Sequence, residues 1–68
     1  MDIGARLQDA REAAGLTQEQ LARKVKVTRQ AISKIENTGR VSLDLLARLA
    51  KVLAVGPEDL VRGKETKP

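Results

Sequence analysis

A short run of polar and basic residues lies in the middle of the chain, at a spacing that could bring their side chains together. At about 100° per residue, an α-helix would place five side chains on one face: Arg29, Gln30, Ser33, Lys34 and Asn37. In the major groove, arginine and lysine pair with guanine, glutamine pairs with adenine, and serine pairs with either base. This face contains no acid, whereas an ordinary solvated helix usually intersperses Glu or Asp for ion pairing. The spacing therefore predicts a helix that contacts base edges in double-stranded DNA.

The excess positive charge lies in the same part of the chain. The protein has 68 residues and a net charge of +4. Residues 23–40 contain six Lys or Arg and one acid, Glu36, whereas the other 50 residues contain seven basic and eight acidic groups. A basic patch of this kind is typical of a site for a polyanion. A solvated basic face without a partner would have the same charge, so the charge alone does not decide between them.

Several classes of function are excluded by residue types that the chain lacks. There is no Cys, His or aromatic residue. Disulfides, zinc fingers and His-based acid–base catalysis are therefore excluded, and we expect neither an enzyme nor a bound metal or cofactor. Without aromatic rings to stack on bases, recognition of single strands and of most RNA is disfavoured. No apolar run approaches the roughly 18 residues of a membrane span. The stretch MDIGARLQDAR lacks the apolar region of a signal peptide, so we expect no secretory signal. We expect a cytoplasmic protein of bacterial or phage type, associated with the nucleoid and making no membrane contact.

The apolar pattern predicts the helices that must position these side chains. Spacings of three and four residues recur along the whole chain, and no alternating stretch predicts a strand. The first helix carries one apolar stripe and ends at Gly15. The expected apolar positions are Ile3, Leu7, Ala10 and Ala14; Leu21, Ala22 and Val25; Ala31, Ile32 and Ile35; Leu43, Leu46, Leu49, Ala50 and Leu53; and Leu60 and Val61.

Start signals separate the later helices. Thr17 with Gln20 forms a T-x-x-Q capping box, Thr28 and Ser42 are further N-caps, and Pro57 suits the first position of a last helix. The sequence thus predicts a compact all-α domain of five helices over residues 1–62, followed by a flexible polar tail, residues 63–68.

The second and third helices have the spacing of a helix-turn-helix. Only a short turn around Lys26 separates them, and Ala22 supplies the small residue needed where they cross. A plain αα-hairpin in a structural bundle would share much of this pattern. The acid-free outer face of the third helix favours the DNA-binding alternative.

At this level of detail the sequence resembles a known family. The stretch LQDAREAAGLTQEQLARKVKVTRQAISKIEN, residues 7–37, is similar to the helix-turn-helix of the lambdoid phage repressor and Cro family, and the wider resemblance runs from Ile3 to Leu60. It rests on the combination of G-L-T-Q-E-Q-L-A, V-T-R-Q-A-I-S-K-I-E-N and S-L-x-x-L. In that family the second helix of the unit docks in the major groove, and two copies bind one palindromic operator.

The resemblance also implies roles for individual residues. Base contacts are implied for Thr28, Arg29, Gln30, Ser33 and Lys34. Phosphate contacts are implied for Gln18, Asn37 and Arg40, with Lys24 and Lys26 as more general electrostatic contributors. For Gln18, an ordinary first-turn role explains the residue equally well. Arg11 and Glu36 are expected to form a structural ion pair. Lys26 occupies the turn position that the family most often gives to Gly, so a strained turn is expected there.

A homodimer is expected because a single small module buries too little surface on DNA for tight, specific binding. Four apolar residues lie off the main stripes and are candidates for the interface: Leu45, Val52, Val55 and Val61. For each of these residues, packing in the core of the monomer explains the apolar side chain equally well.

The leading hypothesis is a transcriptional regulator, acting as a repressor or autoregulator by occupying a promoter. Two alternatives also bind DNA: an antitoxin that in addition binds a toxin protein, and a restriction-modification controller. A protein-interaction adaptor without DNA binding is the alternative of a different class, because fold does not fix function.

Overall fold

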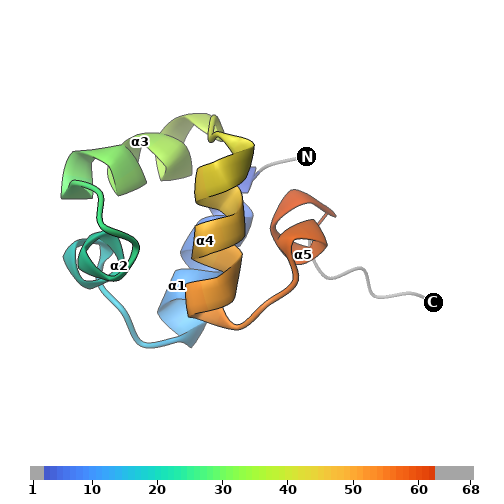
Figure 1. Ribbon diagram of the computed structural model, residues 1–68, viewed down its shortest axis with the longest axis horizontal. Helices are drawn as coiled ribbons and strands as arrows, with labels where there is room; N and C mark the ends of the chain where they lie inside the picture. The colour runs from blue at the N-terminus through green and yellow to red at the C-terminus, as the bar shows by residue number, and fades with distance from the viewer. Residues whose placement is uncertain (1–2, 63–68) are drawn as a thin grey trace.

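Five α-helices account for most of the chain. The computed structural model describes residues 3–62, and within that range there is no strand. The helices are α1 (Ile3–Ala13), α2 (Gln18–Val25), α3 (Arg29–Thr38), α4 (Leu43–Leu53) and α5 (Pro57–Arg62). Figure 1 shows α3 lying across one end of the molecule, with α2 beside it, and α4 running away from the end of α3 between α2 and α5. The predicted all-α, five-helix fold is confirmed, while the predicted tail, residues 63–68, lies outside the described residues.

The N-termini of the three middle helices are capped as the sequence predicts. Thr17 and Gln20 form the reciprocal capping box, in which the Gln20 N–H donates to Thr17 Oγ1 at 3.1 Å and the Thr17 N–H donates to Gln20 Oε1 at 2.9 Å. Thr28 Oγ1 accepts from the backbone N–H of Ala31 at 3.1 Å, and Ser42 caps α4 in the same way. Each cap satisfies an N–H that has no partner within its own helix, which fixes where the helix begins.

One aliphatic core joins all five helices. Six side chains within it have almost no exposed surface: Leu7, Leu21, Val25, Ile32, Leu49 and Leu60. The apolar stripes on α2, α3 and α4 therefore face inward, as the three- and four-residue spacing predicts. None of the described helices combines the length and the hydropathy that crossing a membrane requires.

Six of the predicted apolar positions are less buried than expected, and two of them, Ile3 and Ala10, are half-buried on α1. Leu43 is 82% exposed, because it is the first helical residue after the Ser42 cap and no described element covers it there. Ala14 is exposed because α1 ends one residue earlier, at Ala13. Ala31 is only half-buried, since it lies at the edge of the buried face of α3, and Val61 is 37% exposed in the short final helix.

Gly4 is a buried residue for which the sequence analysis found no role. It lies in the first turn of α1, where this helix meets the last turn of α3. A Cβ atom at this position would lie 2.8 Å from the carbonyl oxygen of Ile35 and would overlap the carbonyl of Glu36. The absence of a side chain thus allows the two backbones to approach closely, and this contact sets how α3 sits on α1.

Candidate nucleic-acid interface

A tight left-handed turn sets the direction of α3 relative to α2. Lys26, with φ of 61° and ψ of 48°, ends α2 in the left-handed conformation. The Val27 N–H donates to the Ala22 carbonyl at 2.9 Å and the Lys26 N–H donates to the Arg23 carbonyl at 3.3 Å, which is the bonding of a Schellman motif. Ala22 is 2% exposed, so its small side chain leaves room for α2 and α3 to pack directly against each other. The short turn therefore produces a helix-turn-helix.

The predicted base-contacting residues lie together at the solvent-facing side of α3. Thr28, Arg29, Gln30 and Lys34 are exposed and Ser33 is half-buried. On the opposite side of the helix, Ile32 and Ile35 are buried in the core. The structure thus brings all five residues to one surface, which we call the α3 face: Thr28, Arg29, Gln30, Ser33 and Lys34.

Among the described residues, no acidic side chain pairs with the cations of this face. Within residues 3–62, neither Arg29 nor Lys34 forms an ion pair. By contrast, Arg23 on α2 pairs with Glu19 at 3.3 Å. The unpaired guanidinium and ammonium groups of α3 are free to bind anions or base acceptors. A cationic surface of this kind attracts a polyanion.

The predicted phosphate-contacting residues lie in the elements that precede and follow the α3 face along the chain. Gln18 is at the start of α2, Lys24 is near its end, and Lys26 is in the turn. Asn37 lies in the last turn of α3, and Arg40 lies in the loop that follows. Four of these side chains are exposed and Gln18 is half-buried. The Arg40 backbone N–H donates to Thr38 Oγ1 at 3.1 Å, which fixes the loop close to the end of α3.

Gln18 has an interaction that the sequence analysis did not predict. Its Nε2 donates to Glu36 Oε1 at 2.9 Å. Since a carboxylate can only accept, the NH₂ group of the amide must face Glu36. The second N–H of the same nitrogen is left to donate to another acceptor. The side chain is therefore held in a defined orientation at the N-terminus of α2.

Arg11 and Glu36 lie in direct contact beneath this surface. Arg11 Nε donates to Glu36 Oε2 at 2.7 Å, and the two side chains are 11% and 5% exposed. Arg11 Nη1 also donates to the Leu16 carbonyl at 2.8 Å. The hydrogen bond to Glu36 raises the pKa of the Arg11 guanidinium, opposed by the effect of burial. The pair ties together α1, α3 and the segment that leads into α2.

The four residues proposed for a dimer interface differ in their surroundings. Leu45, Val52 and Val55 are half-buried and pack against the core of their own chain. Val61 is 37% exposed. The structure therefore gives three of them a role in the monomer and leaves Val61 as the one with the most free surface.

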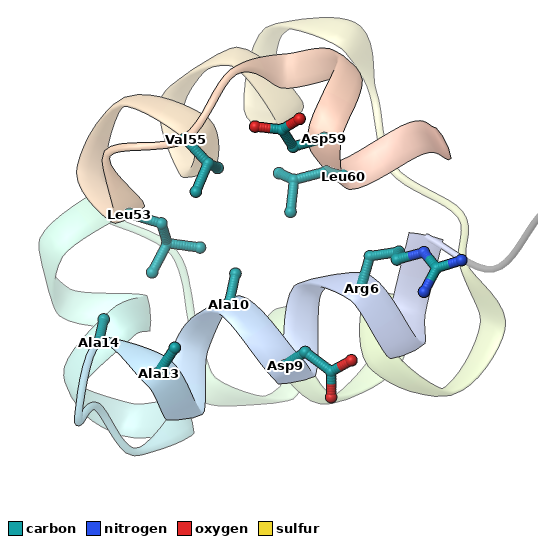
Figure 2. Close-up of a pocket in the computed structure, with 9 residues that line it drawn as sticks. All are labelled: Arg6, Asp9, Ala10, Ala13, Ala14, Leu53, Val55, Asp59 and Leu60. Carbon is teal, nitrogen blue, oxygen red and sulfur yellow. The ribbon is translucent and has the colours of Figure 1, made fainter. Parts of the chain in front are cut away.

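A cavity of about 420 Å³ lies between α1, the end of α4 and α5. Figure 2 shows Ala10 facing this space from α1, opposite Leu53 and Leu60, while Arg6 and Asp9 point away from it. No residue of the α3 face and none of the predicted phosphate-contacting residues lines the cavity. The cavity is thus separate from the candidate nucleic-acid interface.

The fold and the exposed, unpaired cations of α3 define a helix-turn-helix domain. Comparison with known proteins agrees, and the chain belongs to the helix-turn-helix family, which matches residues 7–60. The chain is also 38% identical over 66 residues to the HTH-type transcriptional activator BcrR of Enterococcus faecalis. That match covers 96% of this chain and 32% of BcrR, so the chain spans about a third of the length of this relative.

Two solved structures extend the comparison. The restriction-modification controller protein C.AhdI from Aeromonas hydrophila is 37% identical, with a TM-score of 0.80 and coverage of 85% of this chain and 86% of C.AhdI. The P22 c2 repressor, solved in complex with a synthetic operator, is 28% identical, with a TM-score of 0.85 and coverage of 94% of this chain and 98% of the repressor. The predicted resemblance to phage repressors is confirmed.

Proposed function

We propose that this protein is a sequence-specific transcriptional regulator that binds double-stranded DNA by placing α3 in the major groove. The observation that carries the proposal is the α3 face, on which Arg29 and Lys34 are exposed without an ion pair within residues 3–62. Buried Ile32 and Ile35 hold the other side of the helix against the core, so the polar side chains point outward. Similarity to the operator-bound P22 c2 repressor supports the same orientation.

The residues around the α3 face are proposed to contact the DNA backbone. Phosphate contacts fix the register of a protein on a duplex, and base contacts supply the sequence preference. Gln18 donates its free amide N–H to a phosphate at one side of the recognition helix. Asn37 and Arg40 hold the backbone at the other side, while Lys24 and Lys26 add charge without sequence preference.

The protein is further proposed to bind as a homodimer. A single small module buries about 600–1,000 Å² on DNA, whereas a pair places two recognition helices about 34 Å apart on a palindromic site. The exposed Val61 and the free edges of Leu45, Val52 and Val55 would supply the contact. Sedimentation over a concentration series tests the proposal. A monomer at every concentration, with and without DNA, would exclude it.

The regulatory role is proposed to be that of a repressor or autoregulator that acts by occupying a promoter. Similarity to the restriction-modification controller protein C.AhdI supports a regulatory role, because the match covers 85% of this chain and 86% of C.AhdI. A toxin partner stays a prediction from the sequence, and sequencing the neighbouring gene would test it.

Selection of duplexes from a random library tests the proposed function. The expected result is a set of bound duplexes that share a palindromic sequence. Arg29→Ala should lower affinity for the selected duplex by about 1–3 kcal/mol and relax the preference at one base pair. Lys24→Ala should weaken binding to all duplexes to a similar degree, while Lys51→Ala, on the exposed side of α4, serves as the control for loss of one charge. Recovery of no preferred sequence would contradict the proposal.

A further inference from the structure

Arg48, on α4, contacts the end of the first helix of the helix-turn-helix. Its Nη1 donates to the carbonyl oxygen of Val25 at 3.1 Å, and its Nη2 donates to Asp44 Oδ2 at 2.9 Å. Val25 is the last residue of α2 and directly precedes the left-handed Lys26. The planar guanidinium, anchored by Asp44 one turn earlier on its own helix, therefore reaches the beginning of the turn.

The carbonyl that Arg48 contacts has no partner within α2. The last four carbonyls of a helix lack an intrahelical donor. In α2, the Ala22 and Arg23 carbonyls accept from the N–H groups of Val27 and Lys26. The Val25 carbonyl accepts from Arg48 instead. One side chain from α4 thus supplies a donor to the last carbonyl of α2.

The Arg48 bond offsets part of a cost that arises because the left-handed residue of the turn is not glycine. Lys26 has a φ of 61°, a conformation in which the Cβ atom crowds the following carbonyl oxygen and raises the free energy. Other contacts must offset that cost for the turn to keep one geometry. The two Schellman hydrogen bonds offset part of this cost. The Arg48 hydrogen bond adds to them and links the turn to α4, which lies outside the helix-turn-helix.

We propose that Arg48 is a positioning residue for DNA recognition. By holding the Val25 carbonyl, it fixes the left-handed turn at Lys26, and the turn fixes the direction in which α3 presents Arg29 and Gln30. This inference rests on the proposed function, because a recognition helix must be held at one angle for its side chains to meet particular base edges. Arg48 acts through the turn and is not proposed to contact DNA itself.

A double-mutant cycle on DNA tests the inference. The measured quantity is the ratio of affinities for a duplex selected from the random library and for a duplex of scrambled sequence. Arg48→Ala is expected to lower this ratio about tenfold, which is the discrimination carried by one base contact. In the Lys26→Gly background, where the left-handed turn is not strained, the same change is expected to lower the ratio by only about twofold.

Two control variants distinguish the loss of the Arg48 hydrogen bonds from the loss of one positive charge. Lys51→Ala, three residues further along α4, removes one positive charge from an exposed side chain and should leave the ratio unchanged. Arg48→Lys keeps the charge and loses the planar fork, so it should behave like Arg48→Ala. An equal loss in the original and the Lys26→Gly backgrounds would overturn the inference, as would an equal loss in Lys51→Ala.

Amide hydrogen exchange provides a second readout that needs no DNA. The Val27 N–H, bonded to Ala22 across the turn, should exchange faster in Arg48→Ala. The Val55 N–H makes the matching bond to Ala50 after α4 and should keep its rate. Equal acceleration of both amides would mean a general loss of stability and would overturn the inference. Failure of the unmodified protein to bind any duplex would refute only the proposed function, since the exchange result decides separately whether Arg48 holds the turn.

Discussion

The side-chain amide of Gln18 and the carboxylate of Glu36 are joined by a hydrogen bond of 2.9 Å between Nε2 and Oε1. This bond links the N-terminus of α2 to the last part of α3. The same carboxylate also accepts from Arg11. Glu36 therefore orients a side chain at the surface while it pairs with a buried cation, and the packing of the domain is connected to its proposed contact with DNA.

Replacement of Gln18 should weaken DNA binding without changing sequence preference. Gln18→Ala removes the oriented N–H that is proposed to contact phosphate, so affinity should fall by a similar factor for every duplex. Gln8→Ala, on the exposed side of α1, is the matched control. Fluorescence anisotropy with selected and scrambled duplexes measures the affinity of both variants and their sequence preference. A change in the preferred bases would instead indicate that Gln18 contacts base edges.

Loss of Arg11 should destabilise the fold strongly. Arg11→Ala leaves the Glu36 carboxylate, which is 5% exposed, without its charged partner. Breaking a buried pair in this way costs about 3–5 kcal/mol. Urea denaturation monitored by circular dichroism gives the free energy of unfolding. The control is Arg23→Ala, which breaks the exposed pair with Glu19 and should cost no more than about 1 kcal/mol. Equal effects of the two variants would show that burial of the Arg11 pair does not matter.

From the Arg11–Glu36 pair we also predict how the free energy of unfolding depends on pH above neutrality. The pKa of Arg11 is raised in the folded protein, chiefly by its hydrogen bond to Glu36. A raised pKa of a basic group stabilises the fold below the unfolded-state pKa, and this contribution is lost as the pH rises through the folded-state value. The Arg11 contribution should therefore be constant at neutral and moderately alkaline pH. The difference in free energy of unfolding between the original protein and Arg11→Ala should therefore be the same at neutral and at moderately alkaline pH. A difference that shrinks within this range would contradict the expectation that Arg11 stays charged.

A methyl group at Gly4 should disturb the contact between α1 and α3. The Cβ atom of Gly4→Ala would overlap the backbone carbonyls of Ile35 and Glu36, neither of which can rotate away. Overpacking typically costs about 1–3 kcal/mol, which exceeds the gain in helix propensity from Gly to Ala. Thermal unfolding should show a lower Tm for this variant. Asp9→Ala, at an exposed position of the same helix, should not lower it.

Replacement of Ala54, at the end of α4, by glycine should stabilise the fold. Ala54 has a φ of 60°, so Ala54→Gly should relieve a cost of about 1 kcal/mol. Ala47→Gly, at an exposed position inside the same helix, should destabilise by a similar amount because glycine is a poor helix former. The two variants make the same chemical change, and their free energies of unfolding should move in opposite directions. A shift in the same direction would contradict the left-handed conformation of Ala54.

Local features of the fold could be predicted because local chemistry decides them. The caps at Thr17, Thr28 and Ser42 depend on one side-chain oxygen and an N–H three residues later, and all three form as predicted. The face of α3 follows from the helical period, since Ile32 and Ile35 are buried opposite Arg29.

Features that depend on contacts between distant segments could not be predicted in the same way. The need for glycine at residue 4 arises from the backbone of α3, more than thirty residues away in the chain. The Asp44–Arg48 spacing suggests a helix pair, but the bond from Arg48 to Val25 exists only once α4 packs on α2. Leu43 matches the apolar spacing of α4 and is exposed because the described fold leaves that end of the helix uncovered.

The placement of α3 in the major groove can be tested by removing major-groove acceptors from the DNA one at a time. In a duplex selected from the random library, each purine is replaced by its 7-deaza analogue, which lacks the N7 acceptor that Arg and Gln contact. We predict that affinity falls at particular positions, and that Arg29→Ala loses the sensitivity at one of them. Unchanged affinity at every purine, or no complex with any duplex at low ionic strength, would contradict the placement of α3 in the major groove.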